Sequence, residues 1–183
     1  ASLSKAVRGI YEKYGRIDAV LHGAGIIDDK LIAQKTSESF NRVFDTKADS
    51  MFLLAKHLKP ESLKLMVLFT SIACKIGNQG QVDYNAANEI LNRFAWQLSR
   101  KWKGVRISAI NWGPWDSGPL GMVTPEVKKQ FESRGVTLVD FQTGPKFFRE
   151  ELTHGKKNEI EVIAYEGPLA DEYKFTPASG DTE

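Results

Sequence analysis

Ser71 and Tyr84 are the residues whose types and spacing most directly suggest chemistry. Ser71 follows the apolar run "LMVLFT", and Tyr84 comes 13 residues later, near the start of a predicted helix. A hydroxyl and a phenol that converge on one point can hold a carbonyl oxygen and then protonate it. This chemistry suits the reduction of a carbonyl group, for which a cofactor must supply the hydride because no side chain can.

Other reaction types fit Ser71 less well. No Gly-x-Ser-x-Gly turn surrounds it and no histidine stands near it, which disfavours nucleophilic acyl transfer. The histidines, His22, His57 and His154, are scattered and give no metal-ligand pattern, so we expect no metal. The structural alternative is that Ser71 only satisfies polar groups at the end of a strand.

Tyr84 raises the question of a nearby positive charge. A phenol with a pKa near 10 is a poor acid–base group at neutral pH unless its surroundings adjust it. Asn88 shares a helix face with Tyr84 by its spacing of four residues, but an amide carries no charge. The cation must therefore come from another element.

The apolar pattern predicts alternating strands and helices that could bring these residues together. Helices are expected at 3–14, 36–58 (with Thr36 or Ser37 as N-cap), 83–102, 125–134 and 145–152, and strands at 17–25, 65–71, 105–114 and 159–165. Continuous apolar strands that alternate with helices predict an α/β fold with a doubly wound, Rossmann-type parallel sheet. Its ligand crevice would lie at the carboxyl ends of the strands, where "HGAG", Ser71 and "NWGPW" fall.

Composition limits the class of protein. The chain has 183 residues, of which 42% are hydrophobic and 26% charged, with a net charge of +2. This balance gives no basic stripe for nucleic acid, and no apolar run approaches the roughly 20 residues of a membrane span. Cys74 is the single cysteine, which fits a reducing compartment, so we expect a cytoplasmic protein.

The segments "HGAG", "LFTSIACKIGNQGQVDYNAAN" and "NWGPWDSG" resemble the short-chain dehydrogenase/reductase superfamily. More closely, they are similar to the ketoreductase domains of modular polyketide and polyunsaturated fatty acid synthases, over about residues 3–165. The resemblance implies NADPH-dependent reduction of a β-ketoacyl chain carried on an acyl carrier protein, next to other synthase domains.

Two alternatives stay open beside this interpretation. One is a non-catalytic structural or interaction module that has kept the fold. The other is a free-standing dehydrogenase acting on a small alcohol, which Asn88 and the Trp-Gly-Pro-Trp segment disfavour.

The resemblance also indicates where the cation is. Most members of the superfamily have a lysine four residues after the tyrosine, whereas the synthase ketoreductases have asparagine there and a lysine on the preceding long helix. Asn88 and Lys47 match these two positions. By resemblance, Tyr84 donates the proton, Asn88 supports the proton relay, and Lys47 lowers the pKa of Tyr84 and contacts the cofactor ribose. Without the resemblance, Lys47 reads as a solvated surface lysine.

Further site residues follow from the same resemblance. Gly23, Ala24 and Gly25 correspond to the loop that approaches the cofactor, and Pro114 and Trp115 to the segment against the nicotinamide. Residues expected near the substrate are Asp28, Asp29, Gln81 and, in a lid at 116–135, Met122; Trp112 and Trp96 are expected to be packing residues.

The "IIDD" segment at 26–29 resembles the Leu-Asp-Asp signature of ketoreductases that form the D-configured alcohol. The opposite class has tryptophan eight residues before the tyrosine, where this chain has Ile76. The sequence therefore favours a D-configured product. The resemblance assigns the choice between NADPH and NADH to N-terminal strands of the family that have no counterpart in this sequence.

The first predicted strand corresponds to the fourth strand of the family, and the chain has no Gly-x-Gly-x-x-Gly segment. The sequence thus predicts a Rossmann-type domain without its N-terminal strands and Gly-rich loop, with the catalytic part at 1–167 and a polar tail or linker at 168–183. We expect such a fragment to bind NADPH poorly and to be nearly inactive alone. Strand 17–22 would be an apolar edge through which two copies could pair.

Overall fold

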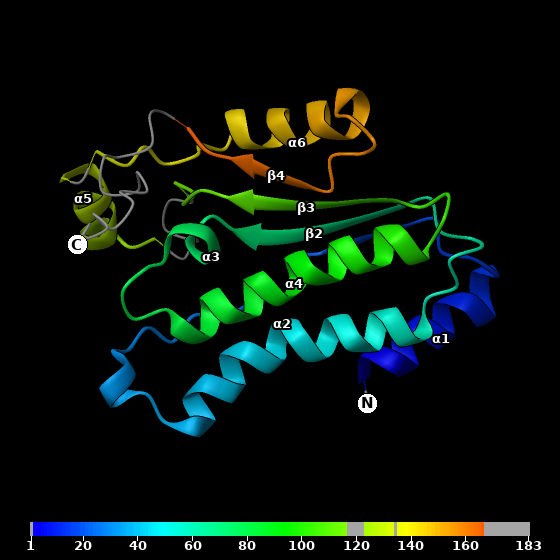
Figure 1. Ribbon diagram of the computed structural model, residues 1–183, viewed down its shortest axis with the longest axis horizontal. Coiled ribbons are helices and arrows are strands. Elements are labelled where there is room, and N and C mark those ends of the chain that lie inside the picture. The colour runs from blue at the N-terminus through cyan, green and yellow to red at the C-terminus, as the bar shows by residue number, and fades with distance from the viewer. Residues whose placement is uncertain (1, 117–122, 134, 167–183) are drawn as a thin grey trace, which may run out of the picture.

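Four parallel strands in the spatial order β1-β2-β3-β4 form the central sheet of the fold (Figure 1). The computed structural model describes residues 2–116, 123–133 and 135–166. The strands are β1 (Ala19–His22), β2 (Leu65–Ser71), β3 (Arg106–Trp112) and β4 (Glu161–Ala164). Ser71 pairs with Trp112, and Trp112 with Ala164, so three strands end at one edge.

Three helices cover one face of this sheet: α1 (Ser2–Tyr14), α2 (Ser37–His57) and α4 (Val82–Lys101) (Figure 1). Along β2, Met66 and Leu68 point to this face and form the larger core cluster with Met51 of α2 and Leu91 of α4. Successive strand residues face opposite sides, so the other residues of β2 must be covered elsewhere.

Helix α6 (Thr143–His154) covers the opposite face (Figure 1). Val67 of β2 and Ile110 of β3 point to that face and pack with Phe147, Phe148 and Leu152. Both faces of the central strands are therefore apolar, which explains why these strands read as continuous hydrophobic runs.

Local interactions explain where α2 begins and ends. The hydroxyl oxygen of the N-cap residue, Thr36, accepts a hydrogen bond from the Ser39 backbone N–H at 3.2 Å, and Lys56 and His57 stand in the last turn. These features fix the position along α2 of Lys47, which faces the sheet.

The predicted α/β class with a doubly wound, Rossmann-type parallel sheet is confirmed by this arrangement. The predicted helices and strands all occur, with bounds that differ by a few residues at their ends. Two short elements were not predicted: η1 (Ile32–Gln34) and α3 (Ala73–Ile76). A further helix, α5 (Pro125–Ser133), lies where it was expected.

Some expectations fall outside the described residues, namely Met122 and the polar tail at 168–183. In the part of the chain that is described, no helix has the length and apolar character needed to cross a membrane.

Candidate active site

A cavity of about 630 Å³ opens at the carboxyl ends of β1, β2 and β3. Most of the residues that the sequence assigned to a site line it: Gly23, Gly25, Asp29, Lys47, Ser71, Gln81, Tyr84, Pro114 and Trp115. Ala24, Asp28 and Asn88 do not line it. The topology therefore brings segments far apart in the sequence to one place.

Tyr84 lies in the first turn of α4 and faces back toward the end of β2, beside Ser71. Burial raises the pKa of Tyr84 above its usual value, and hydrogen bonding by the side chains of Asn88 and Ser71 opposes this rise. The phenol is consequently protonated at neutral pH, as a proton donor must be.

Lys47 is buried rather than solvated, with 4% of its surface exposed. Its Nζ donates to the carbonyl oxygen of Phe69 on β2 at 2.9 Å and lies 6.0 Å from the centre of the Tyr84 ring. Burial lowers the pKa of Lys47 from 10.5 to about 8, so the amine is mostly charged at pH 7.

The resemblance implied that Lys47 lowers the pKa of Tyr84, and this effect stays a prediction. Burial is the largest influence on the phenol and leaves the pKa of Tyr84 raised overall. Lys47 directs its hydrogen bond to the Phe69 carbonyl.

Asn88 sits one helical turn after Tyr84 and is fully buried. Its Nδ2 donates to the Tyr84 backbone carbonyl at 2.8 Å, and its Oδ1 has no hydrogen-bond partner among the described residues. Buried amide oxygens are nearly always satisfied, so this oxygen is an acceptor with unused capacity beside the Tyr84 turn.

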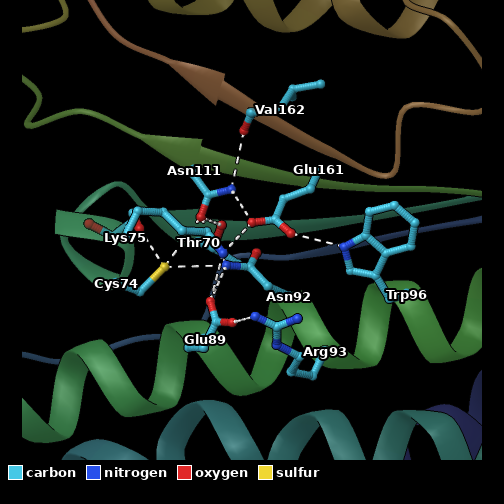
Figure 2. A network of polar contacts seen from close by, with 11 residues as sticks. Thr70, Cys74, Lys75, Glu89, Asn92, Arg93, Trp96, Asn111, Glu161 and Val162 are labelled. Carbon is cyan, nitrogen blue, oxygen red and sulfur yellow. Dashed lines mark hydrogen bonds and ion pairs between the residues drawn. The ribbon is translucent and has the colours of Figure 1, made fainter. Parts of the chain in front are cut away.

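A buried polar network behind Ser71 holds the end of β2 in place (Figure 2). Asn111 of β3 is its centre: Asn111 Oδ1 accepts hydrogen bonds from Thr70 Oγ1 and Asn92 Nδ2, both at 3.0 Å. Cys74 Sγ donates to the Ser71 carbonyl oxygen at 2.9 Å and receives a hydrogen bond from Asn92 Nδ2 at 3.2 Å. The backbone that carries Ser71 is therefore fastened from α3, α4 and β3 at once.

Charged side chains close this network at its outer end. Lys75 of α3 forms an ion pair with Glu89 of α4 at 2.8 Å and another with Glu161 of β4. Glu161 also accepts from Asn111 Nδ2 at 3.3 Å and from Trp96 Nε1 at 3.0 Å, as Figure 2 shows. Trp96, expected as a packing residue, is thus partly exposed and hydrogen-bonded.

The glycine loop after β1 passes close to Lys47. A Cβ on Gly25 would lie 3.0 Å from Lys47 Cε, so a larger residue would push the lysine side chain away. Glycine at this position lets the loop backbone and the ammonium border the same cavity.

An aromatic wall forms the other side of the cavity. The rings of Trp112 and Trp115 meet edge to face with centroids 4.9 Å apart. A Cβ on Gly144, in the first turn of α6, would lie 2.2 Å from the Trp115 ring, so glycine there allows the indole to lie against the helix. Trp112, expected only as a packing residue, lines the cavity as well.

Several lining residues were not assigned from the sequence. The segment 123–141 contributes five apolar side chains: Val123, Val127, Phe131, Val136 and Phe141. Val127 and Phe131 are four residues apart on α5, a spacing that marks one helix face and could have identified them. They make the mouth of the cavity apolar.

The two aspartates of "IIDD" have different surroundings. Asp28 accepts hydrogen bonds from Ser39 Oγ at 2.6 Å and Arg42 Nη2 at 2.7 Å; hydrogen bonding, first from Ser39, holds the pKa of Asp28 well below its usual range. Asp29 faces the cavity and accepts from Gln81 Nε2 at 3.0 Å. Burial raises the pKa of Asp29 despite that hydrogen bond.

Together these groups can protonate an oxygen atom held at the end of β2. Ser71 supplies a hydroxyl, Tyr84 a protonated phenol and Lys47 a buried positive charge at the same cavity. The ammonium has three N–H groups, of which one is used within the described part of the chain. The remaining donors, the glycine loop and the aromatic wall fit a nicotinamide nucleotide.

Comparison with known proteins connects this geometry with one family. The sequence pattern of the KR domain matches residues 1–117. Over 145 residues the chain is 40% identical to a polyunsaturated fatty acid synthase protein of Thraustochytrium, a match that covers 79% of this chain and 5% of that protein. It is 30% identical to a 6-methylsalicylic acid synthase of Arthrobotrys oligospora over 138 residues, or 75% of this chain and 8% of that protein.

Solved structures agree with these sequence matches. An N-terminal ketoreductase from the macrolactin assembly line superposes with a TM-score of 0.75 and 26% identity, over 88% of this chain and 30% of that one. The ketoreductase from the first module of phoslactomycin biosynthesis in Streptomyces gives a TM-score of 0.74 and 27% identity, over 85% and 35%. The chain thus spans about a third of these ketoreductases and a small part of the synthases.

Proposed function

Because this chain belongs to the KR domain family, we propose that it is the catalytic part of a ketoreductase that reduces a β-ketoacyl thioester to the β-hydroxyacyl thioester. The observation that carries the proposal is that Ser71 of β2, Tyr84 of α4 and Lys47 of α2 reach one cavity from three different elements. This convergence matches what carbonyl reduction requires and what a purely structural module would not need.

Tyr84 is the proton donor in this proposal. The Ser71 hydroxyl holds the ketone oxygen, and as the carbonyl carbon is reduced that oxygen takes the phenolic proton of Tyr84. The phenolate left on Tyr84 lies near the Lys47 ammonium, whose charge lowers the cost of forming it in a buried site. Asn88 supports the return of a proton to Tyr84, and its unpartnered Oδ1 is the acceptor atom available for this.

The cofactor proposed is NADPH, which supplies the hydride when bound. Lys47 would donate to its ribose, Gly23, Ala24 and Gly25 would allow close approach of the backbone, and Pro114 and Trp115 would lie against the flat ring. The support for this assignment is the remaining N–H groups on Lys47 and the slot between the glycine loop and the aromatic wall.

The substrate proposed is an acyl chain attached to an acyl carrier protein, delivered by adjoining synthase domains. The relatives are large multidomain synthases, and the mouth of the cavity is lined by apolar side chains such as Val127, Phe131 and Phe141 that suit an aliphatic chain. Asp29 belongs to the "IIDD" segment, whose resemblance to the Leu-Asp-Asp signature favours a D-configured alcohol as product. Chiral chromatography of the product would test this.

The test is NADPH oxidation by the full-length protein in the presence of a β-ketoacyl thioester. We expect Tyr84→Phe to lower the rate by a factor of about 10² or more, and Ser71→Ala by about tenfold to a hundredfold, with little change in cofactor binding. Tyr14→Phe is the matched control, because Tyr14 is exposed at the end of α1. Undiminished reduction by Tyr84→Phe would exclude Tyr84 as the proton donor, and no reduction by the wild type would favour a non-catalytic module.

A further inference from the structure

Lys35 and Asp83 form a buried ion pair beside the candidate site. Lys35 Nζ lies 2.6 Å from Asp83 Oδ2, and only 4% and 1% of the two side-chain surfaces are exposed. Among the ion pairs of the described residues, this is the only one with both side chains so deeply buried. The two residues are 48 positions apart in the sequence, so the pair joins separate segments.

The ion pair lies between the "IIDD" segment and Tyr84. On one side, Lys35 Nζ also donates to the carbonyl oxygen of Asp28 at 2.6 Å. On the other side, Asp83 Oδ1 accepts a hydrogen bond from the Tyr84 backbone N–H at 2.9 Å. A continuous chain of charge-assisted contacts therefore runs from the Asp28 backbone through Lys35 and Asp83 to the backbone of Tyr84.

Contacts at the start of α4 are also made by Gly80 and Gln81, which precede its first residue. Its N-cap residue, Gln81, makes no side-chain capping hydrogen bond and is instead bonded to Asp29. Asp83 is the acidic residue of the first turn, where a carboxylate also interacts favourably with the helix dipole. The turn that carries Tyr84 is thus held by a carboxylate that itself needs Lys35 as a partner.

We propose that Lys35 and Asp83 are positioning residues that set the location of the Tyr84 phenol by fastening the 26–35 segment to the first turn of α4. Two further hydrogen bonds join the 26–35 segment to the residues just before α4. Lys30 N donates to the Gly80 carbonyl at 3.0 Å, and Gln81 Nε2 donates to Asp29. The ion pair therefore also fixes the distance between Asp29 and Tyr84 across the cavity. This inference rests on the proposed reductase function.

Neither residue touches the space where substrate would lie, since the cavity lining includes Asp29, Gln81 and Tyr84 but not Lys35 or Asp83. Loss of the pair should therefore act on the rate of the chemical step rather than on substrate affinity. A displacement of about 1 Å in a catalytic group can cost a factor of about 10² in rate.

The experiment compares Lys35→Met, Asp83→Asn and the double variant Lys35→Met/Asp83→Leu in the full-length protein. The double variant replaces the ion pair by apolar groups, which commonly restores stability lost by breaking a buried pair. Lys30→Met is the matched control, because Lys30 is in the same segment but makes a partly exposed ion pair with Asp28.

Steady-state kinetics and hydrogen exchange are measured together. We expect both single variants to lower kcat at least tenfold with KM changed less than threefold, while Lys30→Met stays within twofold of the wild type. Amides of 80–86 should exchange at least tenfold faster in Lys35→Met, and those of β2 should stay protected. The double variant should keep the low kcat although its β2 amides are protected as in the wild type.

A double variant with wild-type kcat would overturn the proposal, because the pair would then contribute stability only. Unchanged exchange of 80–86 in Lys35→Met would overturn it independently of any activity. If the wild type reduces no β-ketoacyl thioester, the proposed function fails, and the exchange of 80–86 still decides whether the ion pair holds the Tyr84 turn.

Discussion

The ammonium of Lys47 donates to the backbone of β2 at Phe69 while it lies 6.0 Å from the centre of the Tyr84 ring. It is therefore close enough to act on charge that develops on the phenol, but it is held by the sheet and not by Tyr84. Because burial lowers the pKa of Lys47 to about 8, its charge changes within an accessible pH range.

Reduction should therefore depend on the protonation of Lys47. As pH rises through about 8 the ammonium becomes neutral, the phenolate on Tyr84 loses its neighbouring positive charge, and kcat should fall toward tenfold per pH unit. A pH profile of kcat between 6 and 10 measures this. In Lys47→Arg the guanidinium stays charged above pH 10. We expect this variant to have a lower kcat than the wild type, but no fall in kcat as the pH rises through 8. The same decline in Lys47→Arg would contradict the assignment.

Removing the centre of the buried network should destabilise the domain. Asn111→Leu leaves Thr70 and Asn92 without their shared acceptor, and we expect the free energy of unfolding to fall by about 2–4 kcal/mol. Urea unfolding followed by tryptophan fluorescence measures the loss. Ser99→Ala, which removes a hydroxyl that donates to the Trp96 carbonyl in the same helix, should change it by less than about 0.5 kcal/mol.

His22 should make the fold sensitive to acid. Burial, and then the charge of Lys47, lower the pKa of His22 from 6.5 to about 4, so the unfolded chain binds a proton there before the folded one does. Stability is fully present above pH 6.5 and is lost as pH falls toward 4, by about 2 kcal/mol between pH 7.5 and 5.

Urea unfolding at those two pH values measures the loss, and His22→Gln should reduce it, whereas His57→Gln should not. An equal loss in wild type and His22→Gln would show that other groups cause the acid sensitivity. Ser50 Oγ lies 2.6 Å from His22 Nε2.

We propose that the 183-residue chain, expressed alone, pairs through β1. This strand has one strand neighbour among the described residues, β2, so its other backbone edge is open to a second copy, and the Leu21 side chain on this strand is 54% exposed. Sedimentation at about 50 µM should detect dimers that Leu21→Lys abolishes. A wild-type chain that sediments as a monomer would contradict the pairing.

The fold was predictable because its signals are local. The run "LMVLFTS" gives β2 with the bounds expected for it, and Thr36 caps α2 as its position suggested. The short helix α3 was hidden, because one turn ended by Gly77 at φ 80° resembles an irregular glycine-rich turn in the sequence.

The site was predictable only in part. Spacing and resemblance placed Ser71, Tyr84 and Lys47 together, but no pattern in the sequence shows that Lys47 bonds the Phe69 carbonyl or that burial raises the pKa of Tyr84. The Lys35–Asp83 pair was invisible for a similar reason: two charged residues 48 positions apart read as solvated until the fold buries them.

The proposed acid and its cation stand on different helices, Tyr84 on α4 and Lys47 on α2. Their separation is therefore not set by helical pitch, as it would be for two residues one turn apart, but by how the two rods pack through side chains such as Met51 and Leu91. Substitutions in that interface, far from any substrate, become a means of tuning the acidity of the site in small steps.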